Sequence, residues 1–319
     1  MRRGFAPLGM FALCAALLGT PFVAQLAGAA TAERVSFDSF DIDPETGQPV
    51  IISARYFRPE DNAADAHYAS GKMPAVVALH GCGGMYSAVP ARRDRLTERH
   101  QAMADLLVAE GYAVLFPDSF NPRGRREICS LKLSDQQITQ DNRRLDVLAA
   151  LSYLRTRPEV DGSGVALFGW SHGGSAVLAT MNRRHPLVAQ FLAADASADS
   201  FYRTAIAFYP GCYESVYTRF GYAPASPVSI FIGASDDWTP AYRCVLLGEK
   251  MVKFSEPLRV RTYPDTYHGF DTPNMSTPLH LDVPTGVHPG QGVTIAPNAA
   301  ARDDAFMRMK EQLRAAFAP

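Results

Sequence analysis

The chain has 319 residues, of which 47% are hydrophobic and 20% charged, and its 31 Lys and Arg residues nearly balance 32 Asp and Glu. This composition is typical of a globular protein and argues against a disordered chain. A formal net charge of −1 leaves no basic footprint for nucleic acid. The one apolar stretch near membrane-spanning length lies at the extreme N-terminus, which excludes a multi-pass membrane protein.

Residues 1–32 have the features of a secretory signal peptide. Arg2 and Arg3 form a short positive region, an apolar stretch covers 5–26, and the small residues at 27–29 and 30–32 offer two A-x-A cleavage sites. A retained membrane anchor is the alternative. We expect the leader to be removed and residues 33–319 to act in the periplasm or outside the cell.

The cysteines fit an exported protein. One of the 5 cysteines lies in the leader, and the mature chain keeps Cys82, Cys129, Cys212 and Cys244. An even number of cysteines in an exported chain indicates two disulfides, for which three pairings exist, and free buried thiols are the alternative. There is no C-x-x-C sequence, so neither zinc binding nor thioredoxin-like redox chemistry is supported.

After the leader, the first predicted element is an antiparallel hairpin, 35–41 and 50–57, around a turn at 43–47. Short apolar runs then predict buried strands, and apolar residues at helical spacing predict helices. The predicted strands are 75–79, 112–116, 165–168, 205–208, 228–232 and 258–263. The predicted helices are 95–110, 138–155, 174–181, 242–252 and 299–317. We expect no regular structure in the Pro- and Gly-rich stretch 272–298.

Strands and helices therefore alternate after the hairpin. This order is typical of an α/β fold with a mostly parallel twisted sheet and helices on both faces. The mature chain contains no linker that would divide it and no internal repeat. We therefore predict one α/β domain over 33–319.

The sequence Gly169-Trp170-Ser171-His172-Gly173 is a G-x-S-x-G pattern between a predicted strand and a predicted helix. A sharp strand-to-helix turn raises the serine hydroxyl above the carboxyl edge of the sheet, and the flanking glycines let the backbone make that turn. The following helix directs its N-terminus at the site, which favours developing negative charge. We predict that Ser171 is a nucleophile; an ordinary serine in a tight turn is the alternative.

A nucleophilic serine needs a base, and in hydrolases of this architecture the chain order is Ser, Asp or Glu, then His. Of the 8 histidines, His268 alone combines this order with a position after a predicted strand. Asp236 and Asp237 both follow the strand 228–232. We favour Asp236 as the acid, because a turn at the strand end can direct it inward, whereas Asp237 would point outward or cap the next helix.

A glycine-rich segment at 80–84 follows the predicted strand 75–79, and its backbone amides can turn inward. We expect the amides of Cys82 and His172 to form an oxyanion hole. The sequence contains neither a nucleotide-binding glycine pattern nor H-E-x-x-H. It therefore predicts no cofactor and no metal.

Three more residues are candidates for substrate binding. Arg123 follows the strand 112–116 and would either bind a substrate carboxylate or staple its loop through a salt bridge. Trp170 and Trp238 flank the predicted catalytic residues and would either line an acyl pocket or belong to the core.

Together these segments resemble the dienelactone hydrolase family of α/β-hydrolases, from about 36 to 317. The landmarks are 80–84, Phe116-Pro117-Asp118, 169–174, 233–240 and 267–270. In that family the acid lies three residues after a strand-end glycine and four before a proline, a spacing that Asp236 has. The resemblance implies the α/β-hydrolase fold and hydrolysis of an ester or lactone.

Two features distinguish this chain from the founding members of the family. Ser171 stands where they have a cysteine, and the segment 80–84 lacks their gating glutamate. The chain is therefore similar to the exported, serine-dependent branch. The layout of that branch implies the disulfides Cys82–Cys129 and Cys212–Cys244.

We therefore predict an exported serine hydrolase that acts on a small-molecule ester or lactone through Ser171, Asp236 and His268, with no nucleic acid or membrane partner after leader cleavage. Two alternatives remain at this point. One is a peptidase of the prolyl-oligopeptidase type, and the other is a non-catalytic binding protein on a hydrolase scaffold.

Overall fold

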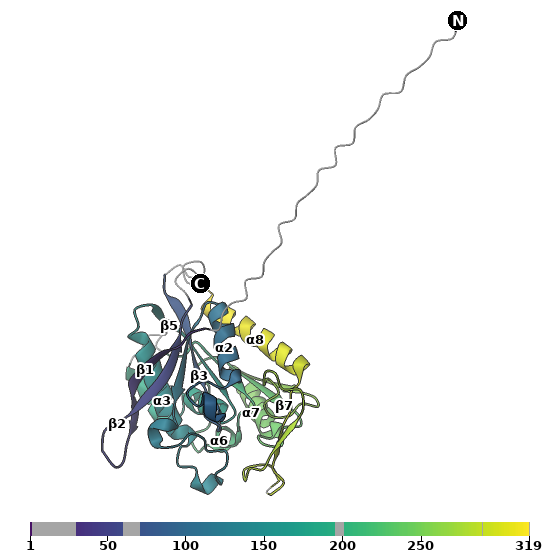
Figure 1. Cartoon of the computed structure of the whole chain (residues 1–319). Helices are drawn as coiled ribbons and strands as arrows, with labels where there is room; N and C mark the ends of the chain where they lie inside the picture. Colours follow the sequence, from purple (N-terminus) through teal and green to yellow (C-terminus); the bar gives the residue numbers. More distant parts are fainter. Residues whose placement is uncertain (2–29, 60–70, 195–200, 289, 319) are drawn as a thin grey trace.

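Figure 1 presents a computed structural model of the chain, which describes residues 1, 30–59, 71–194, 201–288 and 290–318. The predicted signal peptide falls outside these residues except at its two ends. In the described part, eight strands form one sheet in the order β1-β2-β4-β3-β5-β6-β7-β8. A second sheet contains two short strands.

The main sheet combines an antiparallel edge with a parallel centre. Its strands are β1 (Glu33–Ile42), β2 (Pro49–Phe57), β3 (Met73–Leu79), β4 (Ala113–Asp118), β5 (Val160–Trp170), β6 (Thr204–Phe208), β7 (Val228–Gly233) and β8 (Leu258–Tyr263). The hairpin β1–β2 is antiparallel, as is the β2–β4 pair, and the pairs from β4 through β8 are parallel. Every residue of β3, β4 and β6 is buried, which explains their continuous apolar runs.

Helices cover both faces of this sheet (Figure 1). They are α2 (Glu98–Ala109), α3 (Gln140–Arg155), α4 (His172–Met181), α5 (Pro186–Ala194), α6 (Tyr213–Tyr217), α7 (Ala241–Lys253) and α8 (Ala299–Phe317). The helices α3 and α4 pack side by side on one face. On the other face α2 and α8 are joined by an ion pair between Glu110 and Arg314, at 2.6 Å. The predicted α/β-hydrolase architecture is confirmed.

Capping residues determine where the predicted helices begin. Thr97 accepts a hydrogen bond from the amide of His100, so α2 starts at Glu98 and not at residue 95. Thr139 and Asn142 form a capping box, so α3 starts two residues later than predicted. Apolar spacing alone cannot locate these starts, because it continues across the cap.

The prediction for 272–298 is wrong in part, because this stretch contains the antiparallel strands β9 (Leu279–Leu281) and β10 (Val293–Ile295). Three-residue strands are too short to show an alternating pattern. The helices α5 and α6 were also not predicted. A five-residue helix such as α6 gives little periodicity, and α5 buries only Val188.

The parallel strands place their carboxyl ends at one edge of the sheet. The segments that follow β3, β4, β5, β6, β7 and β8 therefore meet there. None of the helices in the described part of the chain has the length and hydropathy of a membrane span.

Candidate active site

Ser171 lies at the sharp turn between β5 and α4. Its φ of 52° and ψ of −119° put a non-glycine residue in a strained conformation. The amide of Ser171 donates to the carbonyl oxygen of Phe208 at 2.9 Å, which ties the turn to β6. Gly173 fits where no other residue can, since a Cβ there would lie 2.3 Å from the carbonyl oxygen of Leu79. The surrounding packing therefore holds the turn that the G-x-S-x-G pattern predicts.

Asp236 and His268 form a buried hydrogen-bonded pair. The Nδ1 atom of His268 lies 2.8 Å from Oδ2 of Asp236, and both residues are buried. The amides of Trp238 and Thr239 donate to Oδ1 of Asp236 at 2.9 and 2.7 Å, and the Thr239 hydroxyl donates to Oδ2 at 3.0 Å. These contacts fix the carboxylate. By contrast, Asp237 accepts from the amide of Thr294 at 2.8 Å.

The hydrogen bond to Asp236 determines the chemistry of His268. A carboxylate can only accept, so Nδ1 carries the proton and Nε2 keeps its lone pair. Nε2 is buried and has no hydrogen-bond partner among the residues that the structure describes. The imidazole therefore presents a free basic nitrogen, which is the atom that a general base uses.

Tyr209 packs against the base, with its ring centroid 4.4 Å from that of His268. Its hydroxyl donates to Asp271 at 2.5 Å, and the indole of Trp170 donates to the same carboxylate at 2.7 Å. Burial raises the pKa of Tyr209 well above its usual value, so the hydroxyl remains a donor. The Tyr209 backbone has a φ of 37°, which turns the chain at the end of β6.

The glycine-rich segment 80–84 runs beside the serine. A Cβ on Gly81 would lie 3.4 Å from Cβ of Ser171 and 4.0 Å from its Oγ. The next residue, Cys82, is bonded to Cys129, and its carbonyl oxygen accepts from the amide of Ile128 at 2.8 Å. The backbone beside Ser171 is thus held from two directions. The second disulfide is Cys212–Cys244, so both bonds have the pairing that the family resemblance implies.

A cluster of basic side chains surrounds Phe120 on this side of Ser171, of which His80 and Arg143 are buried and His172 is part-exposed. The ring of Phe120 lies 4.5 Å from His80 and 6.1 Å from His172, and the guanidinium of Arg143 lies 5.3 Å from it. Nη1 of Arg143 donates to Nδ1 of His172 at 3.0 Å. Burial lowers the pKa of Arg143 to about 10, which leaves it charged at neutral pH. Burial and Arg143 together lower the pKa of His172 to about 3, and that of His80 well below 6.5.

The remaining candidates separate into structural and site residues. Arg123 binds Asp41 at 2.7 Å and Asp146 at 2.8 Å, so it makes the loop-stapling contact and not a free anion site. Trp170 is fully buried and stacks on Phe116, so it belongs to the core and does not line a pocket. Trp238 lies at the site, with its ring 4.9 Å from that of His268.

Sequence reasoning missed Tyr209, Asp271 and Arg143. Tyr209 directly follows β6, so its strand-end position gave a usable signal, and Asp271 lies only three residues after the predicted base His268. Arg143 gave none, because a charged residue on an amphipathic helix is normally interpreted as solvent-facing.

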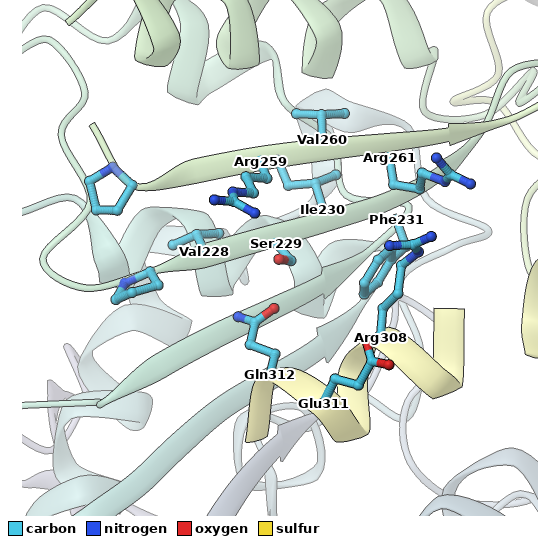
Figure 2. A pocket seen from close by; sticks show the side chains of 12 residues that line it. Val228, Ser229, Ile230, Phe231, Arg259, Val260, Arg261, Arg308, Glu311 and Gln312 are labelled. Atoms are coloured by element: carbon cyan, nitrogen blue, oxygen red, sulfur yellow. The ribbon is translucent and has the colours of Figure 1, made fainter. Parts of the chain in front are cut away.

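A separate hollow of about 590 Å³ lies between β7, β8 and α8. Figure 2 shows Arg259 and Arg261 on β8 opposite Arg308 on α8. Arg308 and Arg261 both face Asp304, at 2.8 and 3.6 Å, and none of the predicted catalytic residues lines this hollow. Within the described ranges no group of three or more His, Cys, Asp or Glu side chains could hold a metal ion.

The parallel sheet, the turn at Ser171 and the Asp236–His268 pair define an α/β-hydrolase. The model of the dienelactone hydrolase family matches residues 62–317, and the chain belongs to that family.

Comparison with known proteins gives two kinds of likeness. The quorum-quenching protein AidA of Acinetobacter baumannii is 34% identical over 155 residues, which are 49% of this chain and 41% of that protein. The match thus spans less than half the length of that relative. Two solved structures share the fold. The dienelactone hydrolase-like promiscuous phosphotriesterase P91 from metagenomic libraries is 19% identical with a TM-score of 0.60, covering 91% of this chain and 100% of that one. Esterase 2 of Thermogutta terrifontis is 15% identical with a TM-score of 0.56, covering 92% and 95%.

Proposed function

We propose that residues 33–319 form an exported serine hydrolase that cleaves a small-molecule carboxylic ester or lactone through an acyl-enzyme. Ser171 is the nucleophile, His268 is the general base and acid, and Asp236 orients His268. The observation that carries the proposal is the 2.8 Å hydrogen bond that Nδ1 of His268 donates to Asp236, which leaves Nε2 with a free lone pair.

In the first half-reaction, Nε2 of His268 takes the proton of the Ser171 hydroxyl while Oγ attacks the substrate carbonyl carbon. The resulting oxyanion accepts hydrogen bonds from the backbone amides of Cys82 and His172. The tetrahedral intermediate then collapses, the bond to the alkoxy oxygen breaks, and the proton on Nε2 moves to that oxygen. For a lactone, the released hydroxyl stays attached to the acyl group.

In the second half-reaction, water replaces the alcohol. Nε2 of His268 removes a proton from the water, whose oxygen attacks the acyl carbon. The second tetrahedral intermediate expels Oγ of Ser171, which regains its proton from His268. The acid product leaves, and Asp236 remains ionised throughout because its role is to hold the ring and stabilise its positive charge.

Export is the second part of the proposal. Two disulfides support an oxidising compartment. The backbone amide of Ala30 donates to the Asp105 carboxylate at 2.8 Å, and Gln101 donates to the Ala30 carbonyl oxygen at 3.1 Å. Cleavage after Ala29 would turn that amide into an ammonium group facing a carboxylate. Of the two predicted cleavage sites we therefore favour the first, which leaves residues 30–32 attached to the domain 33–319. N-terminal sequencing of the exported protein tests this position.

The catalytic proposal is tested with the chain from Ala30 onward, produced with its disulfides formed. Hydrolysis of p-nitrophenyl acetate and butyrate is compared with that of Ser171→Ala, whose kcat should fall on the order of 10⁴-fold or more. A fluorophosphonate probe should label Ser171 in the native protein alone. Folded native protein that neither hydrolyses the esters nor reacts with the probe would show that the chain is a binding scaffold.

A further inference from the structure

The side chain of His172 is held in one tautomer. A guanidinium has only donors, so the 3.0 Å contact from Nη1 of Arg143 makes Nδ1 of His172 an acceptor. The proton of the neutral ring must then lie on Nε2. Arg143 is fully buried and cannot exchange this contact for water without moving.

The Nε2–H group of His172 has no acceptor among the described residues. Of the two ring nitrogens, Nδ1 is the one that bonds a described residue. Nε2 is not among the fully buried atoms that lack a partner, so it is in part exposed to solvent. The residue is part-exposed, whereas its neighbours Ser171 and Gly173 are buried. The Nε2–H donor of His172, polarised by the contact of Arg143 with Nδ1, is therefore accessible from the surface beside Ser171.

This donor stays neutral over the working range of pH. Two basic groups face it, Arg143 from α3 and His80 from the end of β3. Burial of the ring and the charge of Arg143 bring the pKa of His172 to about 3. His80 is itself held neutral by burial and Arg143, which lower its pKa well below 6.5.

The sheet order indicates which part of a substrate this donor meets. His268 and Asp236 follow β8 and β7, on one side of β5. Phe120, whose ring contacts that of His172, follows β4, and His80, whose ring contacts Phe120, follows β3, both on the other side. Because His268 protonates the departing alkoxy oxygen, the alcohol lies on the β7–β8 side and the acyl group extends toward His172.

We propose that the Nε2–H group of His172 donates a hydrogen bond to an oxygen in the acyl portion of the substrate, so that the enzyme prefers acyl groups with an oxygen near the ester carbonyl over plain alkyl groups. This inference rests on the proposed serine hydrolase function.

A matched substrate pair tests the inference. p-Nitrophenyl methoxyacetate and butyrate have acyl chains of equal length, and an ether oxygen in one replaces a methylene group in the other. The ratio of their kcat/KM values is measured for the native protein, His172→Leu and His172→Gln. The ratio should fall about fivefold in His172→Leu, the effect of one neutral hydrogen bond, and most of it should return in His172→Gln, which keeps an N–H donor. Differences in intrinsic ester reactivity cancel between variants.

The chain contains a second pair of an arginine and a histidine that serves as a matched control, with its arginine on the same helix as Arg143. Arg144 donates to Nε2 of His185 at 3.1 Å, away from Ser171. His185→Leu should leave the substrate ratio unchanged. A native ratio in His172→Leu, or an equal loss in His172→Gln, overturns the inference while leaving Ser171-dependent hydrolysis intact. If the native protein showed no Ser171-dependent hydrolysis, the proposed function itself would be overturned, and this inference with it.

The tautomer can be read without relying on the Leu variant. Long-range ¹H–¹⁵N spectra of the native protein, with the His172 signals assigned by their loss in His172→Gln, should show a neutral ring protonated at Nε2. A ring protonated at Nδ1 would contradict the hydrogen bond from Arg143 and overturn the inference.

Discussion

A histidine lies on each side of Ser171, and the two histidines serve opposite purposes. On the acid–base flank, which we define as Asp236 and His268, an imidazole faces a carboxylate at 2.8 Å. On the donor flank, defined as Cys82, Arg143 and His172, an imidazole faces a guanidinium at 3.0 Å. The carboxylate favours a ring that can accept a proton at Nε2, whereas the guanidinium fixes the proton there and keeps the ring neutral.

Each flank also has its own disulfide. Cys82–Cys129 holds the backbone beside Ser171 on the donor flank. Cys212–Cys244 joins the start of α6 to α7, the helix that follows Asp236. Neighbouring charge, and not residue type, therefore decides which of the two histidines beside Ser171 handles protons. Substitutions on each flank should therefore differ in kind as well as in size.

The largest effect is expected from removing the acid–base carboxylate. Asp236→Asn keeps the shape of the side chain but lets His268 adopt the other tautomer, so kcat should fall on the order of 10⁴-fold at neutral pH. Steady-state hydrolysis of p-nitrophenyl butyrate measures this loss. Asp237→Asn is the control, because Asp237 bonds the amide of Thr294 and not the base. Comparable losses in both variants would show that the Asp236–His268 pair is not the working pair.

Removing either disulfide should lower the free energy of unfolding, but only one of the two removals should lower kcat. Each bond should contribute about 4 kcal/mol to the free energy of unfolding, given sequence separations of 47 and 32 residues. Replacing Cys82 and Cys129 with serine should in addition lower kcat about tenfold, because a loosened amide stabilises the oxyanion less well. Replacing Cys212 and Cys244 should cost stability with little change in kcat. Urea unfolding and kcat are measured at a temperature where both double variants are folded. Equal losses of kcat in the two variants would contradict a specific role for Cys82.

Tyr209→Phe should produce a smaller change on the acid–base flank. It removes the bond to Asp271 that holds the aromatic ring against His268. We expect kcat to fall about threefold and KM to stay constant, with about 1–3 kcal/mol lost in stability. Tyr202→Phe is the matched control, since it removes another buried hydroxyl, which donates to the Val147 carbonyl oxygen at 2.8 Å. A kcat loss of the same size in the control would assign the effect to stability alone.

The acid–base flank was largely predictable from the sequence, whereas on the donor flank Arg143 was not. Ser171, Asp236 and His268 each follow a strand with a clear apolar run, and parallel strands bring such positions to one edge. Arg143 lies on the helix α3, whose polar residues have the sequence pattern of a solvent-exposed face. Its burial follows from packing of α3 on α4, which periodicity does not encode.

The hairpin β1–β2 and the strands β9 and β10 also show that a sequence pattern predicts long elements better than short ones. The hairpin β1–β2 was predicted because nine- and ten-residue strands alternate over many positions. The strands β9 and β10 have three residues each, and their pairing depends on long-range contacts. One such contact is the bond from Trp238 Nε1 to the Thr285 hydroxyl at 3.0 Å, which ties this segment to the catalytic edge.

The smallest expected effect tests the donor flank directly. In the native fold His172 has a pKa of about 3, against about 6.5 in the unfolded chain, so the unfolded state binds more protons between these values. The free energy of unfolding should therefore fall as pH decreases from about 6.5 toward 3. Arg143→Met removes the charge but keeps the burial, so the pKa of His172 should rise part of the way. The fall between pH 7 and 4 should then shrink by up to about 1 kcal/mol.

Urea unfolding at the two pH values measures this difference, and an imidazole titration followed by NMR assigns it to His172. Arg144→Met is the control for the NMR titration, because Arg144 faces His185 and its removal should leave the titration of His172 unchanged. The native ring should show no titration above pH 5, and the ring in Arg143→Met should titrate at a higher pH than the native one. If His172 titrated near pH 6.5 in the native protein, the guanidinium would not be fixing its proton, and the two flanks would not differ in the way that their neighbouring charges require.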